Sequence, residues 1–535
     1  KGDEDLQKDY EYVGEDAGQH FIDTLAKIED DLKARLKAAL KKYGPSEAMI
    51  LTDEQFQQHS KETKCHICSK EFYHIGQNCE YNGLDLGARV KDHDHYSGFY
   101  RGAAHNLCNL RASIKVASDF RIPVVFHNLS YDMCLFLREA AERVPISVLP
   151  KNMEKFKTMK MESYNFIDSM DFMADSLSNL IDNIPKKDRT MLNTIGENEE
   201  QRKLVHGKGF LPYDKINDMG WLDLTTIPIQ SDFDNKLSMT KISNDDYAIV
   251  VKTWKAFNMK TRRDYHDHYL KLDVYGLADV MSNYREMSLR EYGMDPVQFA
   301  GLPGFAWSAM LRLTKVKLEL FTDVDMYLFC EKGIIGGFTN AMQKHAKANC
   351  PEMGDGFDEK KLTTYLMHLD ANNLYGHSMS QKLPTHGFRW GSEEVCRQIE
   401  KKGSVPTTNP CFVEATIDYP RHLHHLHRHF PVMPEKMELS GSCKLVGALN
   451  QKKKYIIHYE ALNYYLSLGL KIVEVHRVLE FVEQDFMKSW IDFNTAKRAA
   501  GKSDFEKNFY KLMNNSCFGK SMENVRGRSS VRVAN

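Results

Sequence analysis

No apolar run in this chain is long enough to form more than one β-strand. Residues 122–126 (IPVVF) are typical of the longest runs, whereas a membrane-spanning helix needs about 20 apolar residues. Longer segments are amphipathic instead: between residues 15 and 42, apolar side chains recur at helical spacing with Lys-rich positions between them. Strand-length runs that alternate with amphipathic helices predict a fold of mixed α/β (α+β) class and exclude a membrane-spanning chain.

The size and charge of the chain narrow its class further. Its 535 residues, 42% of them hydrophobic, are enough for about three or four packed domains. Lys and Arg number 72 against 73 Asp and Glu, so no whole-chain positive field draws the protein to nucleic acid, and such contacts need local patches. The 11 Cys are scattered and do not form a disulfide framework, which favours a reducing compartment over secretion.

Four thiol and imidazole side chains form two short pairs with metal-ligand spacing. Two residues separate Cys65 from Cys68, and two separate His105 from Cys108. Thiolates with one imidazole suit Zn²⁺, and both pairs can close on one tetrahedral ion. We therefore predict a structural zinc site, with Cys79 as a competing ligand. The alternative is that these Cys lie in a loop and bind nothing.

The segment between the two pairs carries a second set of candidate ligands. Asp92 and Asn109 are a carboxylate and an amide that can hold Mg²⁺, and His93 can deprotonate water for attack on phosphate. Together with the zinc pairs, these residues resemble the recombination endonuclease VII family of His-Me finger nucleases. His105 stands where that family usually has Cys. A His-rich surface loop without nuclease activity is the alternative.

Two acid-containing patterns follow the predicted finger. Asn128 and Asp132 come directly after the strand predicted at residues 122–126, and Tyr269 and Asp273 share one face of a predicted helix. Two-metal hydrolysis of phosphodiesters needs converging carboxylates and a group that orients water, and these side chains supply part of that set. Taken singly, each Asp is equally typical of a helix N-terminus or a solvated helix face.

Taken in order, the two patterns resemble the second and third exonuclease motifs of family B DNA polymerases, N-x-x-(F/Y)-D and Y-x-x-x-D. Between them, Ser176 and Leu177 resemble the (S/T)-L-x-x-h motif with which protein-primed members bind single-stranded DNA. The first exonuclease motif, D-x-E on a strand, is expected upstream of this chain. The resemblance implies a 3′–5′ exonuclease whose residues are Asn128 for DNA, Asp132 and Asp273 for Mg²⁺, and Tyr269 for orienting water.

Two further patterns point to nucleotide chemistry. Residues 365–369 are predicted to form an apolar strand that ends in Asp370, which can hold Mg²⁺, while the nearby ring of Tyr375 can stack under a sugar. Residues 490–519 are predicted to form two helices broken at Gly501. On the second helix, a cation, an amide and a glycine lie four residues apart and share one face, as suits a triphosphate and a nascent base pair: Lys511, Asn515 and Gly519.

These patterns resemble motifs A (D-x-x-S-L-Y-P) and B (K-x-x-x-N-S-x-Y-G) of family B polymerases, with Phe518 in place of the motif B Tyr. Arg498 is a further candidate for the triphosphate, with a solvated Arg as the alternative. Gly336 and Gly337 occupy the place of the Y-x-G-G linker that contacts DNA between the exonuclease and polymerase domains, with Ile334 in place of Tyr. The residues after motif B form a basic patch fit for template or primer phosphates: Lys520, Arg526, Arg528 and Arg532.

The resemblance extends from about residue 12 to the end of the chain. It is greatest to the protein-primed DNA polymerases of Polinton/Maverick transposons and adintovirus-like elements. It implies an RNase H-like exonuclease domain with a small zinc-stabilised His-Me finger, followed by an incomplete right-hand polymerase palm and fingers. The expected divisions are an N-terminal helical remainder of the exonuclease domain (1–64), the finger (65–117), the exonuclease-like domain (118–300) and the polymerase part (301–535).

The same resemblance implies cofactors and partners. Mg²⁺ or Mn²⁺ would serve catalysis and Zn²⁺ would be structural. The partners would be primer–template DNA, dNTPs and a terminal protein as primer, with no membrane involved. The expected location is the nucleus or a viral replication site in the cytoplasm.

Motif C, the Y-x-D-T-D-S hairpin that carries the second palm carboxylate, does not occur in the sequence. We therefore expect a fragment that lacks both ends and does not extend primers by itself. Three functions stay open: a protein-primed family B DNA polymerase with a 3′–5′ exonuclease, a metal-dependent endonuclease that works through residues 65–112, and a zinc-stabilised DNA-binding relic with an inactive polymerase.

Overall fold

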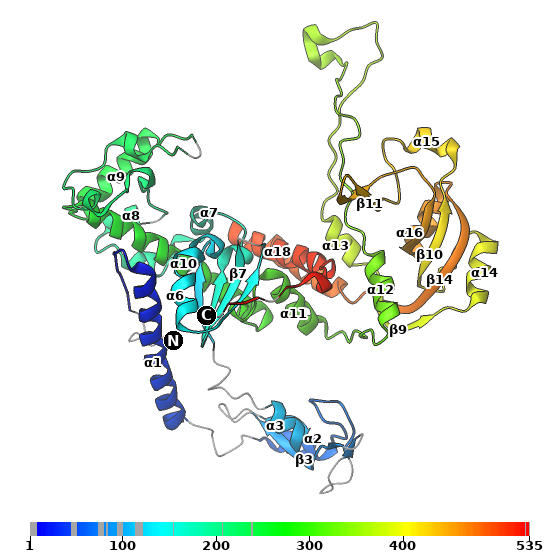
Figure 1. Ribbon diagram of the computed structural model, residues 1–535, viewed down its shortest axis with the longest axis horizontal. Coiled ribbons are helices and arrows are strands. Elements are labelled where there is room, and N and C mark those ends of the chain that lie inside the picture. The colour runs from blue at the N-terminus through cyan, green and yellow to red at the C-terminus, as the bar shows by residue number, and fades with distance from the viewer. Residues whose placement is uncertain are drawn as a thin grey trace. The chain divides into compact units, whose positions relative to one another are not determined.

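A computed structural model divides the chain into two compact units (Figure 1). The first contains residues 1–174 and 529–535, and the second contains residues 175–528. No helix in the described part of the chain is long and apolar enough to cross a membrane. The described residues are 8–43, 51–72, 80–81, 84–93, 100–112, 121–152, 155–205, 207–236, 239–529 and 531–533.

The first unit is built on a five-stranded sheet in the order β15-β6-β7-β8-β5. Strands β5 and β8 are parallel, and the other neighbours are antiparallel. The long helix α1 (Ala17–Tyr43) contributes Ile22 and Leu25 to the core of this unit. It matches the amphipathic helix expected between residues 15 and 42. The strands are β5 (Ile122–Phe126), β6 (Ile146–Pro150), β7 (Phe156–Met161), β8 (Tyr164–Asp168) and β15 (Val531–Val533).

The sequence predicts one helix over residues 131–143, but the structure has three short pieces there. These are α5 (Leu129–Asp132), a 3₁₀ turn (Met133–Leu135) and α6 (Leu137–Arg143). Phe136 interrupts the helix with φ −140° and ψ 1°. Its ring is buried and lies 5.5 Å from the ring of Phe126 and 5.6 Å from that of Phe166. Burial of this aromatic side chain therefore takes precedence over helix continuity.

The predicted finger also lies in the first unit. Helix α2 (Asp53–Lys61) is followed by the short strands β1 (Glu80–Tyr81) and β2 (Leu84–Asp85). Strands β3 (Arg89–His93) and β4 (Tyr100–His105) pair as an antiparallel hairpin, and helix α3 (Asn106–Ala112) follows at once. The described residues therefore form a ββα arrangement.

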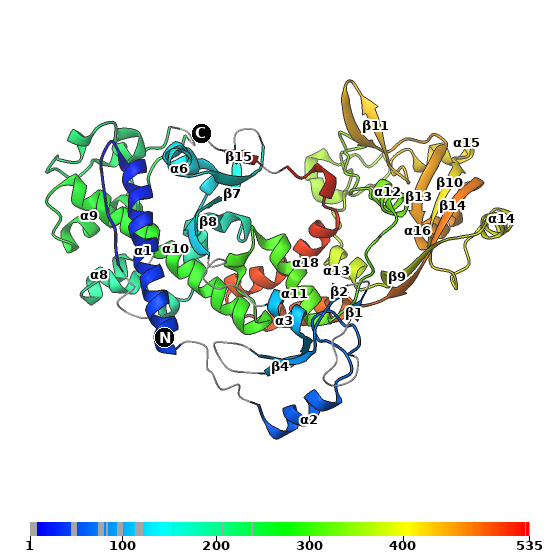
Figure 2. The same ribbon diagram turned by 60° about the horizontal axis from the view of Figure 1, so that its bottom comes forward.

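The helical part of the second unit follows the sequence closely. Helical periodicity over residues 245–292 predicts two helical segments with a break near Asn258. The structure has α9 (Asn244–Ala256) and α10 (Arg262–Tyr292), and Asn258 between them takes the left-handed φ of 50°. The two helices predicted around Gly501 are α17 (Lys488–Ala500) and α18 (Asp504–Ser521). Both pack against α11 (Leu302–Thr314) (Figures 1 and 2). Shorter helices are α7 (Leu177–Asp182), α8 (Glu199–Leu204) and α13 (Leu374–Met379).

A four-stranded antiparallel sheet, in the order β13-β10-β14-β9, forms the rest of the second unit. Side chains alternate between its two faces: Val413 packs with α14, α15 and α16, whereas its neighbour Phe412 packs with α12. Each face therefore has its own helical cover. The elements are α12 (Val324–Gly333), β9 (Leu383–Trp390), α14 (Glu393–Lys402), β10 (Cys411–Asp418), α15 (Arg421–His427), the hairpin β11–β12 (Glu435–Leu439, Ser442–Val446), β13 (Lys452–His458), α16 (Tyr459–Ser467) and β14 (Lys471–Gln484).

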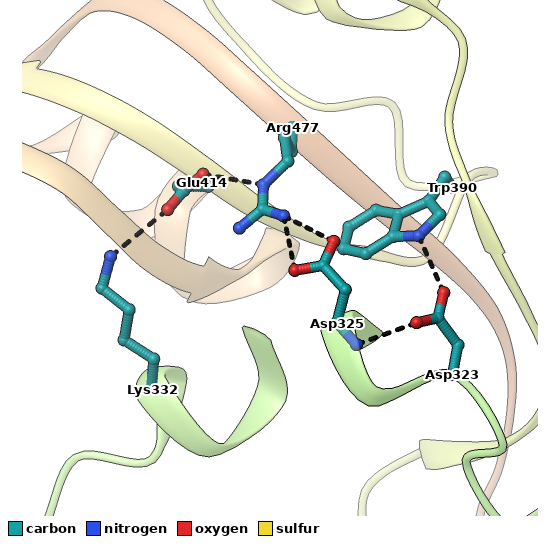
Figure 3. Close-up of polar contacts among 6 residues, drawn as sticks. All are labelled: Asp323, Asp325, Lys332, Trp390, Glu414 and Arg477. Atoms are coloured by element: carbon teal, nitrogen blue, oxygen red, sulfur yellow. Dashed lines mark hydrogen bonds and ion pairs between the residues drawn. The ribbon is translucent and has the colours of Figure 1, made fainter. Parts of the chain in front are cut away.

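A polar network fastens α12 to this sheet (Figure 3). The guanidinium of Arg477 on β14 donates to Glu414 on β10 at 3.0 Å and to Asp325 on α12 at 2.9 Å. Its Cζ lies 5.1 Å from the ring centres of both Phe329 and Trp390. Because Glu414 is buried, these partners offset the cost of removing its charge from water. The network fixes where α12 lies on the sheet.

Candidate functional site

An aromatic stack joins the segment with Asp370 to the helix with Lys511. Helix α13, which begins four residues after Asp370, packs against α18. The rings of Tyr375 and Phe518 are parallel within 10° and 4.2 Å apart between centres. The structure therefore brings together the two patterns that resemble motifs A and B, although more than a hundred residues separate them in sequence.

Helix α18 presents the expected polar face. Lys511 and Gly519 are exposed and Asn515 is half-buried, whereas Met513 and Cys517 on the other side are buried. Nothing within 4 Å would meet a side chain at position 519, so the helix is open to a ligand there. Lys511 makes no ion pair with any described residue.

A buried hydrogen-bond chain positions α18 relative to its neighbours. Tyr292 on α10 donates to Asn494 on α17 at 2.6 Å, and Asn494 donates to Asn514 on α18 at 2.9 Å. Arg498 lies one turn further along α17 and is exposed, without a side-chain partner among the described residues. Since buried polar groups tolerate little misplacement, this chain sets the rotation of α18.

The strand predicted at residues 365–369 is wrong. These residues belong to no strand, and Tyr365, Leu366 and Leu369 are 62%, 64% and 81% exposed. A strand needs a hydrogen-bonded neighbour, and the described residues give this segment only an isolated bridge between Asn349 and Thr364 just before it. Asp370 is exposed and has no partner among the described residues.

The first acid pattern lies at the carboxyl ends of β5 and β8, which run parallel with Phe126 opposite Asp168. Asn128 takes a left-handed φ of 80° at the N-terminus of α5, and its N–H donates to the Asp168 carboxylate at 2.9 Å. Partial burial, with the nearby charge of Asp168, raises the pKa of Asp132. The ionised form of Asp132 therefore destabilises the folded protein relative to the protonated form.

Asp168 is a residue that the sequence patterns missed. It is 1% exposed and also accepts the N–H of Met170 at 3.0 Å, and its second oxygen lies 3.7 Å from Lys151 Nζ. It therefore holds the turn that carries Asn128 and Asp132. Residues 164–167 are predicted from their composition to form a strand, and the only sequence signal for Asp168 is its place directly after them. The strand pairing was needed to bring it near Asp132.

The second acid pattern lies on α10, in the second unit. Tyr269 and Asp273 share one helix face as expected. The hydroxyls of Tyr213 and Tyr269 are hydrogen-bonded, and Lys208 Nζ lies 3.6 Å from the Asp273 carboxylate. Burial, with the charge of Asp273, raises the pKa of Tyr269 well above its ordinary value. Lys208 and Tyr213 were not found from the sequence, because no spacing links them to α10.

A cavity of about 290 Å³ borders this group of residues and is lined in part by Lys208, Tyr269 and Ser178. Ser176 caps helix α7 by accepting the N–H of Asn179, and Leu177 is buried. The side chain of Leu177 therefore packs inside the protein rather than at a surface that DNA could reach. Asn128 and Asp132 belong to the other unit.

The four predicted zinc ligands meet in the structure. One ligand atom from each of Cys65, Cys68, His105 and Cys108 lies within 4.8 Å of the others. His105 Nδ1 is 3.4 Å from Cys68 Sγ and 3.9 Å from Cys108 Sγ. Three thiols and one imidazole at these separations fit a tetrahedral Zn²⁺. Cys79 lies outside the described residues.

Local electrostatics also suit a metal site. Burial raises the pKa of Cys108 to about 12, and the neighbouring thiols add to this. Burial opposes ionisation of Cys65, but the N–H groups of Cys68, His105 and Ile67 outweigh it and lower the pKa of that thiol. Burial lowers the pKa of His105, so its imidazole is neutral and able to coordinate. A bound cation would stabilise the thiolates that burial disfavours.

The predicted nuclease residues are placed around the same knuckle. Asp92 is 3% exposed, and its carboxylate lies 2.8 Å from Nε2 of His66, which the sequence patterns missed although it stands between Cys65 and Cys68. His93 follows Asp92 at a bulge in the β3–β4 pairing and is partly exposed. Asn109 lies on α3 and is also partly exposed.

The loop after α12 and the basic residues at and beyond the end of α18 differ in the contacts they make. Gly336 and Gly337 are exposed, and nothing lies within 4 Å of the position that a Cβ atom would take at either residue. Three of the four basic side chains of the predicted patch, in contrast, have acidic partners. Arg526 pairs with Glu331, and Lys520 and Arg528 both pair with Glu523.

Comparison with known proteins places the chain in a family. A family model described as "DNA polymerase type B, organellar and viral" matches residues 121–524, which is most of the chain. The chain belongs to this family. No curated protein matches it.

Solved structures of Phi29 DNA polymerase are similar to this family member over most of its length. The orthorhombic crystal form has 13% identity and a TM-score of 0.42, with 82% of this chain and 64% of that chain covered. The ternary complex with primer–template DNA and incoming nucleotide substrates has 13% identity and a TM-score of 0.39, with coverages of 82% and 63%. The chain thus spans somewhat less than two thirds of those polymerases.

Proposed function

We propose that this chain is the exonuclease and polymerase part of a protein-primed type B DNA polymerase that copies a DNA template from dNTPs. The observation that carries the proposal is the stack of Tyr375 on Phe518, because it joins the segment of Asp370 to the ligand-facing side of α18. Family membership over residues 121–524 supports the same function.

Each residue at this junction has a defined part in nucleotidyl transfer. Asp370 would hold Mg²⁺, which stabilises the charge that develops on the transferred phosphates. Lys511 would pair with the triphosphate, and Asn515 and Gly519, one and two turns further along the same face, would meet the nascent base pair. The ring of Tyr375, held by Phe518, would lie under the sugar.

Primer extension by the complete natural polypeptide tests this function. We expect Asp370→Ala to abolish dNTP incorporation, because a metal ligand would be lost, and Lys511→Met to reduce it by at least about tenfold. Asp355→Ala changes an exposed acid in the same stretch of chain and should leave incorporation unchanged. Extension that survives in Asp370→Ala would remove the polymerase proposal.

We further propose that the finger binds one structural Zn²⁺ and that it cuts DNA with Mg²⁺ at Asp92 and Asn109 and His93 as the base. The convergence of four ligand atoms within 4.8 Å supports the zinc part. The ββα arrangement of residues 89–112 supports the nuclease part. A zinc-stabilised DNA-binding relic is the alternative, and cleavage of branched DNA that is lost in His93→Ala distinguishes the two.

The 3′–5′ exonuclease is a separate proposal. In the first unit, Asp132 would be a Mg²⁺ ligand. In the second unit, Asp273 would be a Mg²⁺ ligand and Tyr269 would orient water, with Lys208 near the Asp273 carboxylate. Loss of 3′-end degradation in Asp273→Ala, with primer extension retained, is the expected result. Two further proposals rest on the sequence resemblance. The chain would be related to the polymerases of Polinton/Maverick transposons and adintovirus-like elements, and a terminal protein would serve as its primer.

A further inference from the structure

Two arginines that follow α18 each face a glutamate carboxylate in the same bidentate manner. Arg528 approaches Glu523 with two nitrogens, Nε to Oε1 at 2.7 Å and Nη2 to Oε2 at 2.7 Å. Lys520, in the last turn of α18, also pairs with Glu523. These hydrogen bonds lower the pKa of Glu523 to about 2, so it is fully ionised at neutral pH.

Arg526 forms the second pair, with Glu331 on α12. Its Nε lies 2.9 Å from Oε1 and 2.8 Å from Oε2, and its Nη2 lies 2.5 Å from Oε2. The two residues are 195 positions apart in sequence, so the fold, not the local chain, brings them together. Arg526 and Glu331 belong to the same compact unit.

Both pairs have the geometry with which arginine binds phosphate. A guanidinium that faces two oxygens through two nitrogens matches a carboxylate and a phosphate equally well. The Arg526 side chain is 64% exposed and that of Arg528 is 52% exposed. A polyanion can therefore reach these side chains once the carboxylates move away.

We propose that Glu331 and Glu523 are internal phosphate mimics, which occupy Arg526 and Arg528 until the phosphates of a DNA strand displace them. The inference rests on the proposed DNA binding and adds a regulation to it. A DNA strand that lies along the segment after α18 exchanges two carboxylates for two phosphates. A strand that merely collides with the surface finds these cations already neutralised.

The exchange has a measurable electrostatic signature. A free cation that binds a phosphate releases condensed counterions, which makes log K fall with log salt concentration by about 0.9 per contact for duplex DNA. A cation that must first leave a carboxylate contributes less to the binding free energy and to its salt dependence, because one ion pair replaces another. The carboxylates therefore weaken binding to non-specific DNA and flatten its salt dependence.

Binding of a fluorescein-labelled primer–template duplex to the full chain, measured between about 50 mM and about 200 mM salt, tests the proposal. In Glu331→Gln, we expect affinity at the lowest salt to rise about three- to tenfold and the salt slope to steepen by about 0.9. Glu331→Gln/Arg526→Gln should lose both changes, because the freed cation is then absent.

A matched control separates this effect from a general change in charge. Glu393→Gln on α14 also removes one carboxylate and frees one arginine, Arg397, whose side chain is 69% exposed. This variant should bind DNA with the wild-type slope. Equal effects of Glu393→Gln and Glu331→Gln, or wild-type binding by Glu331→Gln, would overturn the proposal.

Two further results keep the test interpretable. If the unmodified chain binds no DNA, the proposed DNA-binding function fails, not only the regulation. If Glu331→Gln binds less tightly and melts at a lower temperature, Glu331 is a structural residue and its role as a phosphate mimic is wrong. Glu523→Gln then repeats the test on Arg528, whose pair lies within one short segment and does not involve α12.

Discussion

At the scale of single residues, several side chains of the proposed sites lie where burial or a neighbouring negative charge opposes their ionisation. Asp132 is partly buried beside the charge of Asp168, and the thiols of Cys65 and Cys108 are packed against one another. Such arrangements destabilise the protein unless a ligand compensates, which is why they indicate function more than an isolated acid or thiol does.

The raised pKa of Asp132 gives a prediction about stability and pH. A carboxyl group whose folded-state pKa lies above its unfolded value stabilises the fold when protonated, and this contribution is lost as pH rises through the folded pKa. At neutral pH, Asp132→Asn should therefore raise the melting temperature of the first unit, by no more than about 3 °C for a half-exposed group. The gain should shrink as pH falls toward about 4, the ordinary pKa of an Asp side chain, as thermal unfolding followed by circular dichroism can check.

The same variant should lose the proposed exonuclease activity. Loss of activity together with greater stability would mean that Asp132 is retained for chemistry at a cost in stability. Asp30→Asn, which changes an exposed acid on α1 in the same unit, should change neither property by a comparable amount. A lower melting temperature in Asp132→Asn would contradict the assigned cause of the shift.

At the scale of elements, α12 has an unusual number of fixed points for a helix of 10 residues. Arg477 and Glu414 hold it to the sheet (Figure 3). Glu331 joins it to the segment after α18. Its C-terminus leads directly into the loop with Gly336 and Gly337. Helix α12 therefore connects the sheet, the end of α18 and the loop predicted to contact DNA.

Removing Arg477 should loosen this connection. Arg477→Met keeps an apolar stem between Phe329 and Trp390 but leaves the buried carboxylate of Glu414 with Lys332 as its one cationic partner among the described residues. We expect a loss of about 1–3 kcal/mol in the free energy of unfolding, measured by urea denaturation. Hydrogen exchange should increase in residues 324–333.

Arg397→Met provides the comparison on α14, which covers the same sheet. Arg397 pairs with Glu393 at 2.8 Å, and both side chains are exposed, at 69% and 88%. The expected cost is below about 1 kcal/mol, and exchange in α12 should be unchanged. Equal costs for the two variants would mean that the network of Figure 3 contributes no more than a surface ion pair.

At the scale of the whole molecule, the two compact units have separate cores. One is built around the five-stranded sheet of the first unit, and others lie on either face of the four-stranded sheet in the second. The four thiol and imidazole ligands belong to the first unit alone. A metal bound there would stabilise the finger without direct effect on the second unit.

Chelation should therefore affect the units differently. Removal of zinc with 1,10-phenanthroline should abolish the protection of β3 and β4 from hydrogen exchange, because structural zinc contributes folding free energy directly. Protection of β10 and β14 should not change. Cys108→Ser should reproduce the effect and reduce bound zinc from about one per chain to a small fraction, whereas Cys134→Ser, which changes an exposed thiol of the same unit, should not. Unchanged protection of β3 after chelation would contradict a structural role for the metal.

The sequence by itself determined the elements whose stability is local. The break at Asn258, the helices on either side of Gly501, and strands β5, β8 and β10 follow from periodicity and turn-forming residues alone. The shared face of α18 and the two zinc pairs follow from spacing, because helix geometry and short knuckles fix which side chains meet.

Only the tertiary structure decided which distant groups meet. Residues 365–369 have the composition of a strand, but a strand requires a neighbour, and the fold gives the described segment none. Three residues have partners that the fold alone places beside them. Asp168 accepts the N–H of Asn128, His66 contacts Asp92, and Glu331 pairs with Arg526. Contacts of this kind depend on packing across long sequence separations, which no local pattern of residues contains.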